Sequence, residues 1–384
     1  MPTAMTTLSL LSDLVSVNSI NPSLVPGAPG EAAVAEVAAQ ALKAGGLDVV
    51  FQEAAPGRPN VIGVLDGREP GPAVMLCGHL DTVGVEGMTN PFTPRVAGGR
   101  LYGRGSQDMK GGVAAMIAAA VELARDWRRG RLIVACVADE EYESAGADAL
   151  VKEWTADAAI VTEPTDLAMA VGHKGFAWLE VVTTGRAAHG SRPLEGRDAI
   201  VDMARVLIAL EATDRTLQGR PSSEHQGTPS LHASIITGGR ELSVYPDRCV
   251  LQFERRTVSG EDDGVVVGEV QAILARLRGD DAAFRGEVRL MTSRPPYRLS
   301  PAAPLPVALG ASLEARGLSS APTGMSFWTD AAILAGAGIP SVLFGPGGAG
   351  LHSIEEYVTL ADVDVCRDVL VEVVRRLNEN TTRA

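Results

Sequence analysis

The sequence predicts an α/β protein of two domains, one inserted into the other. Three observations lead to this prediction. Short apolar runs alternate with helical patterns in the first part of the chain, and several of these runs end in an acidic residue or a histidine. The pattern then changes between about residues 176 and 294, where alternating strands accompany two helices. At 384 residues the chain is long enough for about two domains.

The first elements follow from local signals. An amphipathic pattern predicts a helix over residues 8–17, and the segment 19–23, which contains Pro22, ends this helix. A second helix is predicted over residues 31–43 and is closed by Gly45 and Gly46, which occupy the usual C-terminal position. Three short apolar segments then predict strands, at residues 48–52, 60–65 and 73–77.

The last of these strands runs directly into His79 and Asp81. A strand sends alternate side chains to the same side, so the two residues can point together, and the carboxylate can receive the proton of the imidazole nitrogen that does not bind metal. Taken alone, the pair would equally fit a loop histidine capped by a nearby aspartate. A binding site therefore requires further ligands.

Asp108 is the next candidate ligand. It lies in the glycine-rich segment 103–112, where glycines permit tight backbone turns, and the apolar run 113–123 then starts a helix. We therefore expect the Asp108 carboxylate near a helix N-terminus. Three later apolar runs also end in polar residues: 131–138 before Glu140 and Glu141, 158–161 before Glu163, and 340–344 before a glycine-rich segment and His352.

These strand ends could converge on one crevice, because ligands of open α/β sheets bind beyond the carboxyl ends of the strands. Two imidazoles and three or four carboxylates, with no thiolate, suit two divalent ions such as zinc, cobalt or manganese. A hydroxide between two such ions would be a nucleophile at neutral pH, because metal lowers the pKa of bound water to about 7. Of Glu140 and Glu141, one can bind metal and the other accept the water's proton; the sequence alone leaves open which.

The inserted domain is predicted at residues 175–294, and the surrounding domain at residues 1–174 and 295–384. Its predicted elements are strands at 176–184, 230–237 and 248–256, and helices at 198–211 and 261–278.

Composition excludes several classes of protein. The formal net charge of −13 argues against a nucleic-acid binder that depends on a basic face. The four cysteines are far apart and mostly lie in apolar runs, so we expect buried free thiols. The N-terminus lacks a basic segment followed by an apolar core, and no apolar run approaches the roughly 18 residues of a membrane span. We therefore expect a cytoplasmic protein that does not bind membranes.

The chain resembles the metallopeptidase and amidohydrolase family that contains acetylornithine deacetylase, succinyl-diaminopimelate desuccinylase, aminoacylase and carboxypeptidase G2, often called peptidase family M20. The resemblance covers almost the whole chain, in order and spacing. The matching motifs are GHLDTV (78–83), GRGSQDMKGG (103–112), ADEEYESAG (138–146), TEPT (162–165), AAHGSRPLEGRDAI (187–200) and FGPGGAGLHSIEEYV (344–358).

The resemblance implies a mixed-sheet catalytic domain of the zinc-peptidase type, with the inserted α+β domain as a dimerisation or lid domain. It also implies a role for each strand-end residue. These roles are His79 as a metal ligand with Asp81 behind it, Asp108 as the bridging ligand, Glu140 as the general base, and Glu141, Glu163 and His352 as the remaining metal ligands.

Three further residues take roles only through the resemblance. His189, which alone would be read as a surface residue, matches a histidine that reaches the partner subunit's active site and hydrogen-bonds the developing oxyanion. Arg256, otherwise an ordinary strand-end charge, matches an arginine that clamps the substrate carboxylate. Gly347 would offer its backbone N–H to the same carboxylate, although the loop could equally be a turn.

The sequence departs from the family pattern where substrate side chains would be read. Ser243 stands where relatives often carry asparagine, and His232 and Trp328 match no assigned position. We therefore expect a homodimeric amidohydrolase with two divalent ions, most simply zinc, that cleaves an N-acyl amino acid in the manner of acetylornithine deacetylase or succinyl-diaminopimelate desuccinylase. One alternative is a dipeptidase or carboxypeptidase G2-like peptidase of the same family. Another is a non-catalytic metal-binding relative, and the intact set of ligands with Glu140 argues against it.

Overall fold

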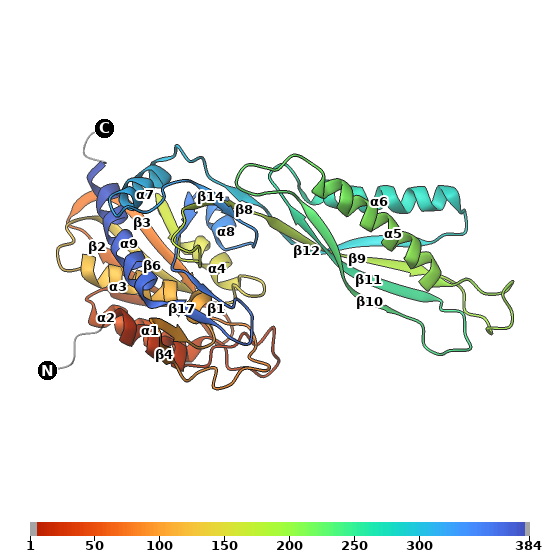
Figure 1. Ribbon diagram of the computed structural model, residues 1–384, viewed down its shortest axis with the longest axis horizontal. Coiled ribbons are helices and arrows are strands. Elements are labelled where there is room, and N and C mark those ends of the chain that lie inside the picture. Colours follow the sequence, from red (N-terminus) through yellow and green to blue (C-terminus); the bar gives the residue numbers. More distant parts are fainter. Residues whose placement is uncertain (1–5, 381–384) are drawn as a thin grey trace. The chain divides into compact units, whose positions relative to one another are not determined.

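The computed structural model describes residues 6–380, which form two compact units (Figure 1). Unit 2 is made of Gly172–Arg298 and Gly324–Trp328, and unit 1 of the other described residues. The predicted inserted domain spans residues 175–294 and does not include the segment 324–328. That segment belongs to unit 2 because the indole N–H of Trp328 donates to the carbonyl oxygen of Pro295 at 3.1 Å and its ring meets Phe176 edge-on.

Unit 1 is built on a mixed sheet, which confirms the predicted α/β class. The strands that position the site are β6 (Arg129–Val137), β3 (Glu69–His79), β7 (Ala158–Val161) and β15 (Ser341–Leu343), adjacent in this order and parallel. Strands β1 (Asp48–Ala55) and β2 (Arg58–Asp66) extend the sheet beyond β6 in antiparallel pairing, and β8 (Ala170–His173) runs antiparallel to β15. The four parallel strands therefore end at one edge of the sheet.

Helix α3 (Gly111–Leu123) contacts β3, β6 and α9 (Leu360–Asn380). It carries no charged residue before Glu122, and an apolar surface on all sides is typical of a helix enclosed by other elements. The remaining helices of unit 1 are α1 (Thr7–Ser16), α2 (Ala32–Ala44), α4 (Ala145–Glu153), α7 (Pro304–Glu314) and α8 (Ala331–Gly336).

A small second sheet in unit 1 was not predicted. Its strand order is β16 (Gly348–Ala349), β17 (Tyr357–Thr359), β5 (Arg100–Tyr102) and β4 (Arg95–Ala97). Arginine side chains stack on its tyrosines, with the guanidinium carbons 4.1 and 4.3 Å from the ring centroids. This sheet brings the segment before Asp108 alongside the segment after His352.

Unit 2 holds a four-stranded antiparallel sheet of order β10 (Ser230–Gly238), β11 (Arg248–Thr257), β9 (Gly175–Thr184) and β12 (Gly286–Arg294). Side chains of β9 and β11 share one hydrophobic core with helices α5 (Ala199–Gln218) and α6 (Asp263–Asp280). Strand β12 was absent from the prediction. Its exposed and partly buried residues alternate at the sheet edge and include charged side chains, which hides it from a search for apolar runs.

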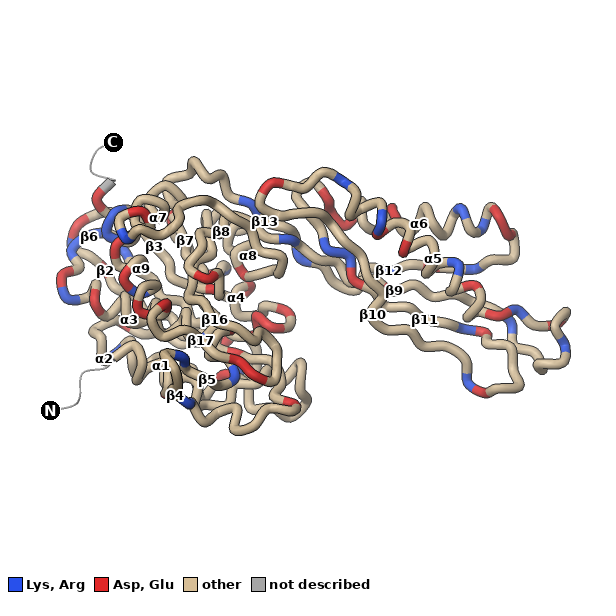
Figure 2. The backbone as a smooth tube through the Cα atoms, in the orientation of Figure 1, with Lys and Arg blue, Asp and Glu red and all other residues tan. Residues whose placement is uncertain are grey.

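Two compositional expectations can be compared with the structure. All four cysteines are free and buried, as predicted. Acidic and basic residues are interspersed along both units, without a single large basic face in the view of Figure 2. Within residues 6–380, no helix combines the length and apolarity needed to cross a membrane.

A buried polar network joins three elements of unit 1. Arg58, at the start of β2, donates from Nε to Glu31 at 2.9 Å and from Nη1 to Asp139 at 2.6 Å, and its Nη2 also bonds Glu31. The Asp139 N–H donates to Glu31 at 3.1 Å. All three side chains are at most 10% exposed, so the guanidinium neutralises two carboxylates that water cannot reach.

We predict that Arg58→Met destabilises the protein by about 3–5 kcal/mol, because it leaves two buried carboxylates without their cation. Arg131→Met is the matched control, since Arg131 pairs with Asp66 across a surface where the two side chains are 49% and 58% exposed. The control should cost about 1 kcal/mol or less. Urea denaturation measures both, and equal losses would contradict the importance of the buried network.

Candidate metal centre

The site lies where the parallel strands of unit 1 end. His79 is the last residue of β3 and pairs in register with Val137 of β6, while Cys77 and Leu343 both pair with Val161 of β7. The residues that follow these strand ends therefore gather at one edge of the sheet. They include Glu140 and Glu141 after β6 and Glu163 after β7.

The carboxylate of Asp108 lies between two imidazoles. Its Oδ1 is 3.0 Å from Nε2 of His79, and its Oδ2 is 3.3 Å from Nε2 of His352. Nε2 of His352 is also 3.1 Å from Oε2 of Glu141. A carboxylate with one oxygen toward each of two imidazoles has the arrangement of a ligand that bridges two cations. The expected place of Asp108 is also found, since it lies in the kinked segment Ser106–Lys110, directly before the N-terminus of α3, and has an extended backbone there (φ −115°, ψ 96°).

Two overlapping sets of side chains have ligand atoms within 4.8 Å of one another. One consists of His79, Glu140 and Glu163, and the other of His79, Asp108 and Glu141. All of these atoms are nitrogen or oxygen, the ligands that zinc, cobalt and manganese accept. The structure thus brings together all six residues expected as ligands or general base.

The electrostatics of the cluster favour a bound cation. Burial, followed by the charge of Glu163, raises the pKa of Glu140 well above its usual range, and burial likewise raises the pKa of Glu163. Burial raises the pKa of Glu141 to about 7, and its Oε1 atom is buried with no hydrogen-bond partner among the described residues. Carboxylates packed in this way repel each other unless a positive charge lies between them. These residues therefore fit a divalent metal.

The histidines show the complementary effect. Hydrogen bonds with Asp108 and Glu141 raise the pKa of His352 to about 10. Burial disfavours the charged form of His79, but hydrogen bonds with Asp108 and Asp81 outweigh this effect and raise its pKa. Protons on the imidazoles thus neutralise carboxylates in the absence of metal, and a metal would replace them.

Asp81 lies behind His79 and also has a second set of partners. Nδ1 of His79 is 3.0 Å from the backbone carbonyl oxygen of Asp81 and 3.5 Å from its carboxylate. The carboxylate also accepts the N–H groups of Glu140 and Glu141, each at 3.1 Å, and the Asn21 side chain at 2.8 Å. Asp81 therefore anchors the turn that carries both glutamates.

The sequence analysis missed residues behind this turn. Nδ2 of Asn21 donates to Asp139 at 3.0 Å as well as to Asp81, so one amide joins two buried carboxylates. Asp139 has a φ of 68°, in the left-handed region, directly before Glu140. In sequence, Asn21 stands only beside Pro22, and Asp139 only before two glutamates, so neither residue shows its buried contacts. Asp330 was missed as well; it is 2% exposed, and its charge contributes to the raised pKa of Glu140 and of Glu163.

The residues expected to contact substrate lie partly in unit 2. His189 is exposed, with Nδ1 2.8 Å from the Ser191 hydroxyl oxygen. Nε of Arg256 donates to Glu254 at 2.6 Å, and its guanidinium lies 5.7 Å from the centre of the Phe176 ring. In unit 1, Gly347 lies beside the carboxylate of Asp362, and its role as a donor to substrate stays a prediction.

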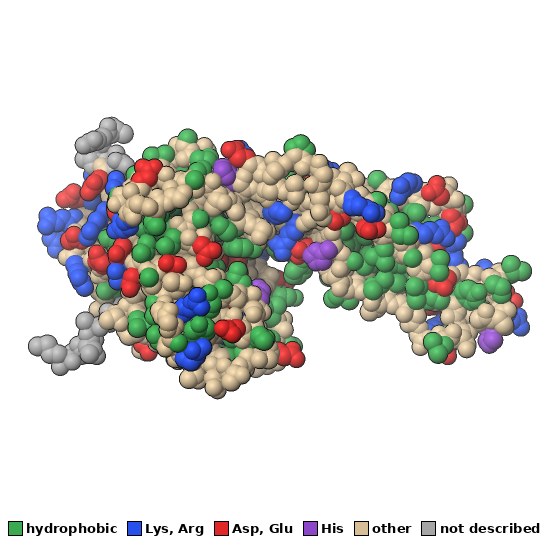
Figure 3. All heavy atoms as spheres, viewed as in Figure 1, with side chains coloured by type: hydrophobic (Ala, Val, Ile, Leu, Met, Phe, Trp, Pro, Cys, Tyr) green, Lys and Arg blue, Asp and Glu red, His purple; other side chains and the backbone are tan. Residues whose placement is uncertain are grey.

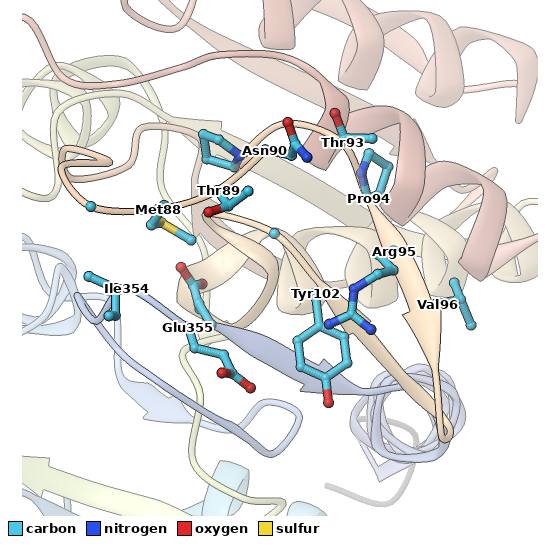
Figure 4. A pocket seen from close by; sticks show the side chains of 14 residues that line it. Met88, Thr89, Asn90, Thr93, Pro94, Arg95, Val96, Tyr102, Ile354 and Glu355 are labelled. Atoms are coloured by element: carbon cyan, nitrogen blue, oxygen red, sulfur yellow. The ribbon is translucent and has the colours of Figure 1, made fainter.

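A cavity of about 740 Å³ lies elsewhere in unit 1 (Figure 4). Arg95 lies against Tyr102 on one side, and Met88 and Ile354 lie on another. None of the six candidate ligand and base residues lines it, although Gly103 and Glu356 do.

Comparison with known proteins identifies the family. The model of peptidase family M20/M25/M40 matches residues 75–376. An acetylornithine deacetylase from Myxococcus xanthus is 31% identical over 322 residues, covering 82% of this chain and 83% of the relative.

Two solved structures share the fold. A tripeptidase from Staphylococcus aureus has a TM-score of 0.81 at 21% identity, covering 97% of this chain and 98% of that one. A dinuclear metal binding peptidase of the M20 family from Bacillus subtilis has a TM-score of 0.75 at 16% identity, covering 97% and 98%. The chain belongs to peptidase family M20/M25/M40 and is a hydrolytic enzyme that acts on amide bonds.

Proposed function

We propose that this enzyme hydrolyses the amide bond of an N-acyl amino acid with the help of two divalent metal ions. The observation that carries the proposal is the Asp108 carboxylate, which lies between His79 and His352 with Glu141 beside it. The relative that is an acetylornithine deacetylase supports an acylated amino acid as substrate.

The ligand assignment combines these contacts with the roles that the family resemblance implies. His79, Asp108 and Glu163 would hold one ion, and Asp108, Glu141 and His352 the other. Nitrogen and oxygen donors without sulfur favour zinc, and cobalt and manganese also fit. When bound, such ions lower the pKa of water and polarise the carbonyl of the scissile amide.

Glu140 is the proposed general base. It is partly buried beside the ligands, its backbone N–H is held by Asp81, and its carboxylate belongs to the cluster with His79 and Glu163. It would accept a proton from the attacking water and deliver that proton to the leaving amine. Assigning the proton transfers to Glu140 leaves Glu141, whose Oε2 atom contacts His352, as the ligand.

His189 and Arg256 are the proposed substrate contacts of unit 2. The exposed imidazole of His189 would donate a hydrogen bond to the oxyanion that develops in the active site of the partner subunit. Arg256 would bind the substrate carboxylate through its planar guanidinium, in exchange for its bond to Glu254. Both roles require side chains of unit 2 to contact the substrate while it is bound at a metal centre.

A homodimer is part of the same proposal. Strand β10 is an edge strand with exposed Ile235 (58%) and Ile236 (50%), and α5 exposes Ile208 (66%) and Val201 (54%). Figure 3 shows hydrophobic side chains gathered on this face of unit 2. An exposed apolar surface beside an unpaired strand edge is typical of a protein interface.

The cytoplasm is the proposed compartment. The four cysteines are free and buried, as is usual for proteins of a reducing compartment.

The test of function is hydrolysis by enzyme that has been stripped with a chelator and reloaded with zinc, cobalt or manganese. We expect no turnover without metal, and turnover of N-acetyl-ornithine, N-succinyl-diaminopimelate or another N-acyl amino acid after reloading. Hydrolysis of dipeptides or tripeptides alone would assign the enzyme to the peptidases of the family. Absence of turnover for all substrates, with metal shown to be bound, would contradict the proposal.

Glu140→Gln should keep the metal ions and lower kcat by about 10²- to 10⁴-fold, because the glutamine cannot accept a proton. Steady-state kinetics and metal analysis of the purified variant measure the two effects separately. Glu143→Gln is the matched control, since this exposed acid lies on the same turn and should leave kcat unchanged. A Glu140→Gln enzyme with wild-type kcat would exclude Glu140 as the base.

Mixing the two inactive variants His189→Ala and Glu140→Ala should restore activity, because a mixed dimer has one site with both groups intact. Random pairing of equal amounts gives about one quarter of the wild-type number of intact sites. Activity is assayed after subunit exchange, with tagged subunits to show that mixed dimers form. If mixed dimers form without activity, His189 does not serve the neighbouring active site.

A further inference from the structure

Glu356 is a buried acid to which neither the sequence analysis nor the proposed mechanism gives a role. Its residue is 1% exposed, and both carboxylate oxygens are fully engaged. Oε1 accepts the N–H groups of Gln107 at 2.9 Å and Asp108 at 3.1 Å. Oε2 accepts the N–H of Gly105 at 3.0 Å and Nη1 of Arg104 at 2.6 Å.

These bonds hold the backbone of the loop that carries the bridging ligand. The loop contains Gly103 and Gly105, with φ angles of 153° and 78°. Glycines have access to many backbone conformations, so this loop would be flexible without contacts that hold its backbone. Three backbone N–H groups of this loop, those of Gly105, Gln107 and Asp108, instead converge on one carboxylate. The backbone oxygen of Glu356 accepts a further bond from the Gly103 N–H at 3.2 Å.

Arg104 connects this arrangement to two other segments. Its Nη2 donates to the carbonyl oxygen of Ser353 at 2.9 Å, and its Nε donates to that of Gly84 at 3.1 Å. Ser353 directly follows His352. The Arg104–Glu356 pair therefore joins the Asp108 loop to the His352 loop. The two paired residues are 252 positions apart in the sequence.

The two proposed ions depend differently on this pair. His79 is the last residue of β3 and Glu163 follows β7, and they are 1% and 4% exposed, so their positions are set by the central sheet and its core. The His352 side chain is 54% exposed and lies on a loop, where its backbone φ is 55°. Besides the contact between His352 and Asp108 themselves, the buried Arg104–Glu356 ion pair is a further charged link between these two loops.

We propose that Glu356 and Arg104 are positioning residues that set the separation of Asp108 and His352. They would thereby control the affinity for the ion held by Asp108, Glu141 and His352 more than the affinity for the ion at His79. This inference rests on the proposed two-metal function. It adds a pair of residues that bind neither metal nor substrate but determine how tightly the second ion is held.

The test is calorimetric titration of metal-free enzyme with zinc, for the wild type, Glu356→Gln and a control. The glutamine keeps the shape of the side chain but turns an NH₂ group toward backbone N–H groups or Arg104, so at least one bond is replaced by a donor facing a donor. We expect two ions in the wild type. In Glu356→Gln, affinity for the weaker ion should fall about 10- to 100-fold, with a smaller change for the tighter ion.

Glu372→Gln is the matched control, because Glu372 pairs with Arg316 and Arg376 in the same unit but contacts no candidate ligand. It should bind both ions with wild-type affinity. Arg104→Lys is a milder second variant, which keeps a charge beside Glu356 but cannot reproduce all three bonds of the guanidinium. It should weaken the same ion by a smaller factor, and it serves if Glu356→Gln does not fold.

A kinetic measurement separates positioning from general destabilisation. With excess zinc, kcat of Glu356→Gln should return to near the wild-type value at unchanged KM, because the ligands themselves are intact. Equal weakening of both ions, or wild-type affinities in Glu356→Gln and Arg104→Lys, would overturn the inference while leaving the metal centre in place. A wild-type enzyme that binds no zinc would instead refute the two-metal function on which the inference rests.

Discussion

The mutual repulsion of buried carboxylates is the constraint on which this structure depends. Glu140, Glu141 and Glu163 lie together at one sheet edge, and burial raises the pKa of each. Such a cluster is unfavourable by itself, and it persists only because the parallel strands and their buried surroundings hold it in place. The energy stored in this way becomes affinity for cations, which is the physical reason for placing the site at the ends of these strands.

Hydrogen bonds to the backbone orient the segments that carry the proposed ligands and the proposed base. Asp81 binds the N–H groups of the two neighbouring glutamates, and Glu356 binds those of the loop that carries Asp108. In both cases a buried carboxylate that is not itself a proposed ligand fixes the segment that bears one. The same logic extends to Asn21, whose amide connects Asp81 to Asp139. The ligands are thus held by a second layer of acids, each compensated by amide, backbone or guanidinium donors.

Much of the fold and the set of site residues could be predicted from the sequence, for identifiable reasons. The parallel strands are continuous apolar runs, and each ends in a polar residue of distinctive type, so pattern and resemblance together led to His79, Glu140 and Glu163. The small sheet of β16, β17, β5 and β4 could not be predicted, because strands of two or three residues carry no periodic signal. Its role is visible only when segments distant in sequence are placed together.

The supporting contacts were beyond the sequence for a similar reason. Arg104 and Glu356, or Arg58 and Asp139, are charged residues of ordinary local context, and only the folded chain shows that they are buried and paired. Gly347 shows the same limit. The glycine-rich loop suggests a backbone donor to substrate, and only the folded chain shows that the Asp362 carboxylate lies beside this glycine. Local patterns thus indicate candidate residues, whereas the contacts of those residues become visible only in the structure.

The most direct test of the central claim is a crystal structure of the zinc-loaded enzyme, with anomalous diffraction recorded at the zinc edge. The account predicts two anomalous peaks that share Asp108, one also contacted by His79 and Glu163 and the other by Glu141 and His352, with Glu140 bound to neither ion. A single peak at saturating zinc, no peak, or a zinc ion bound directly by Glu140 would contradict it.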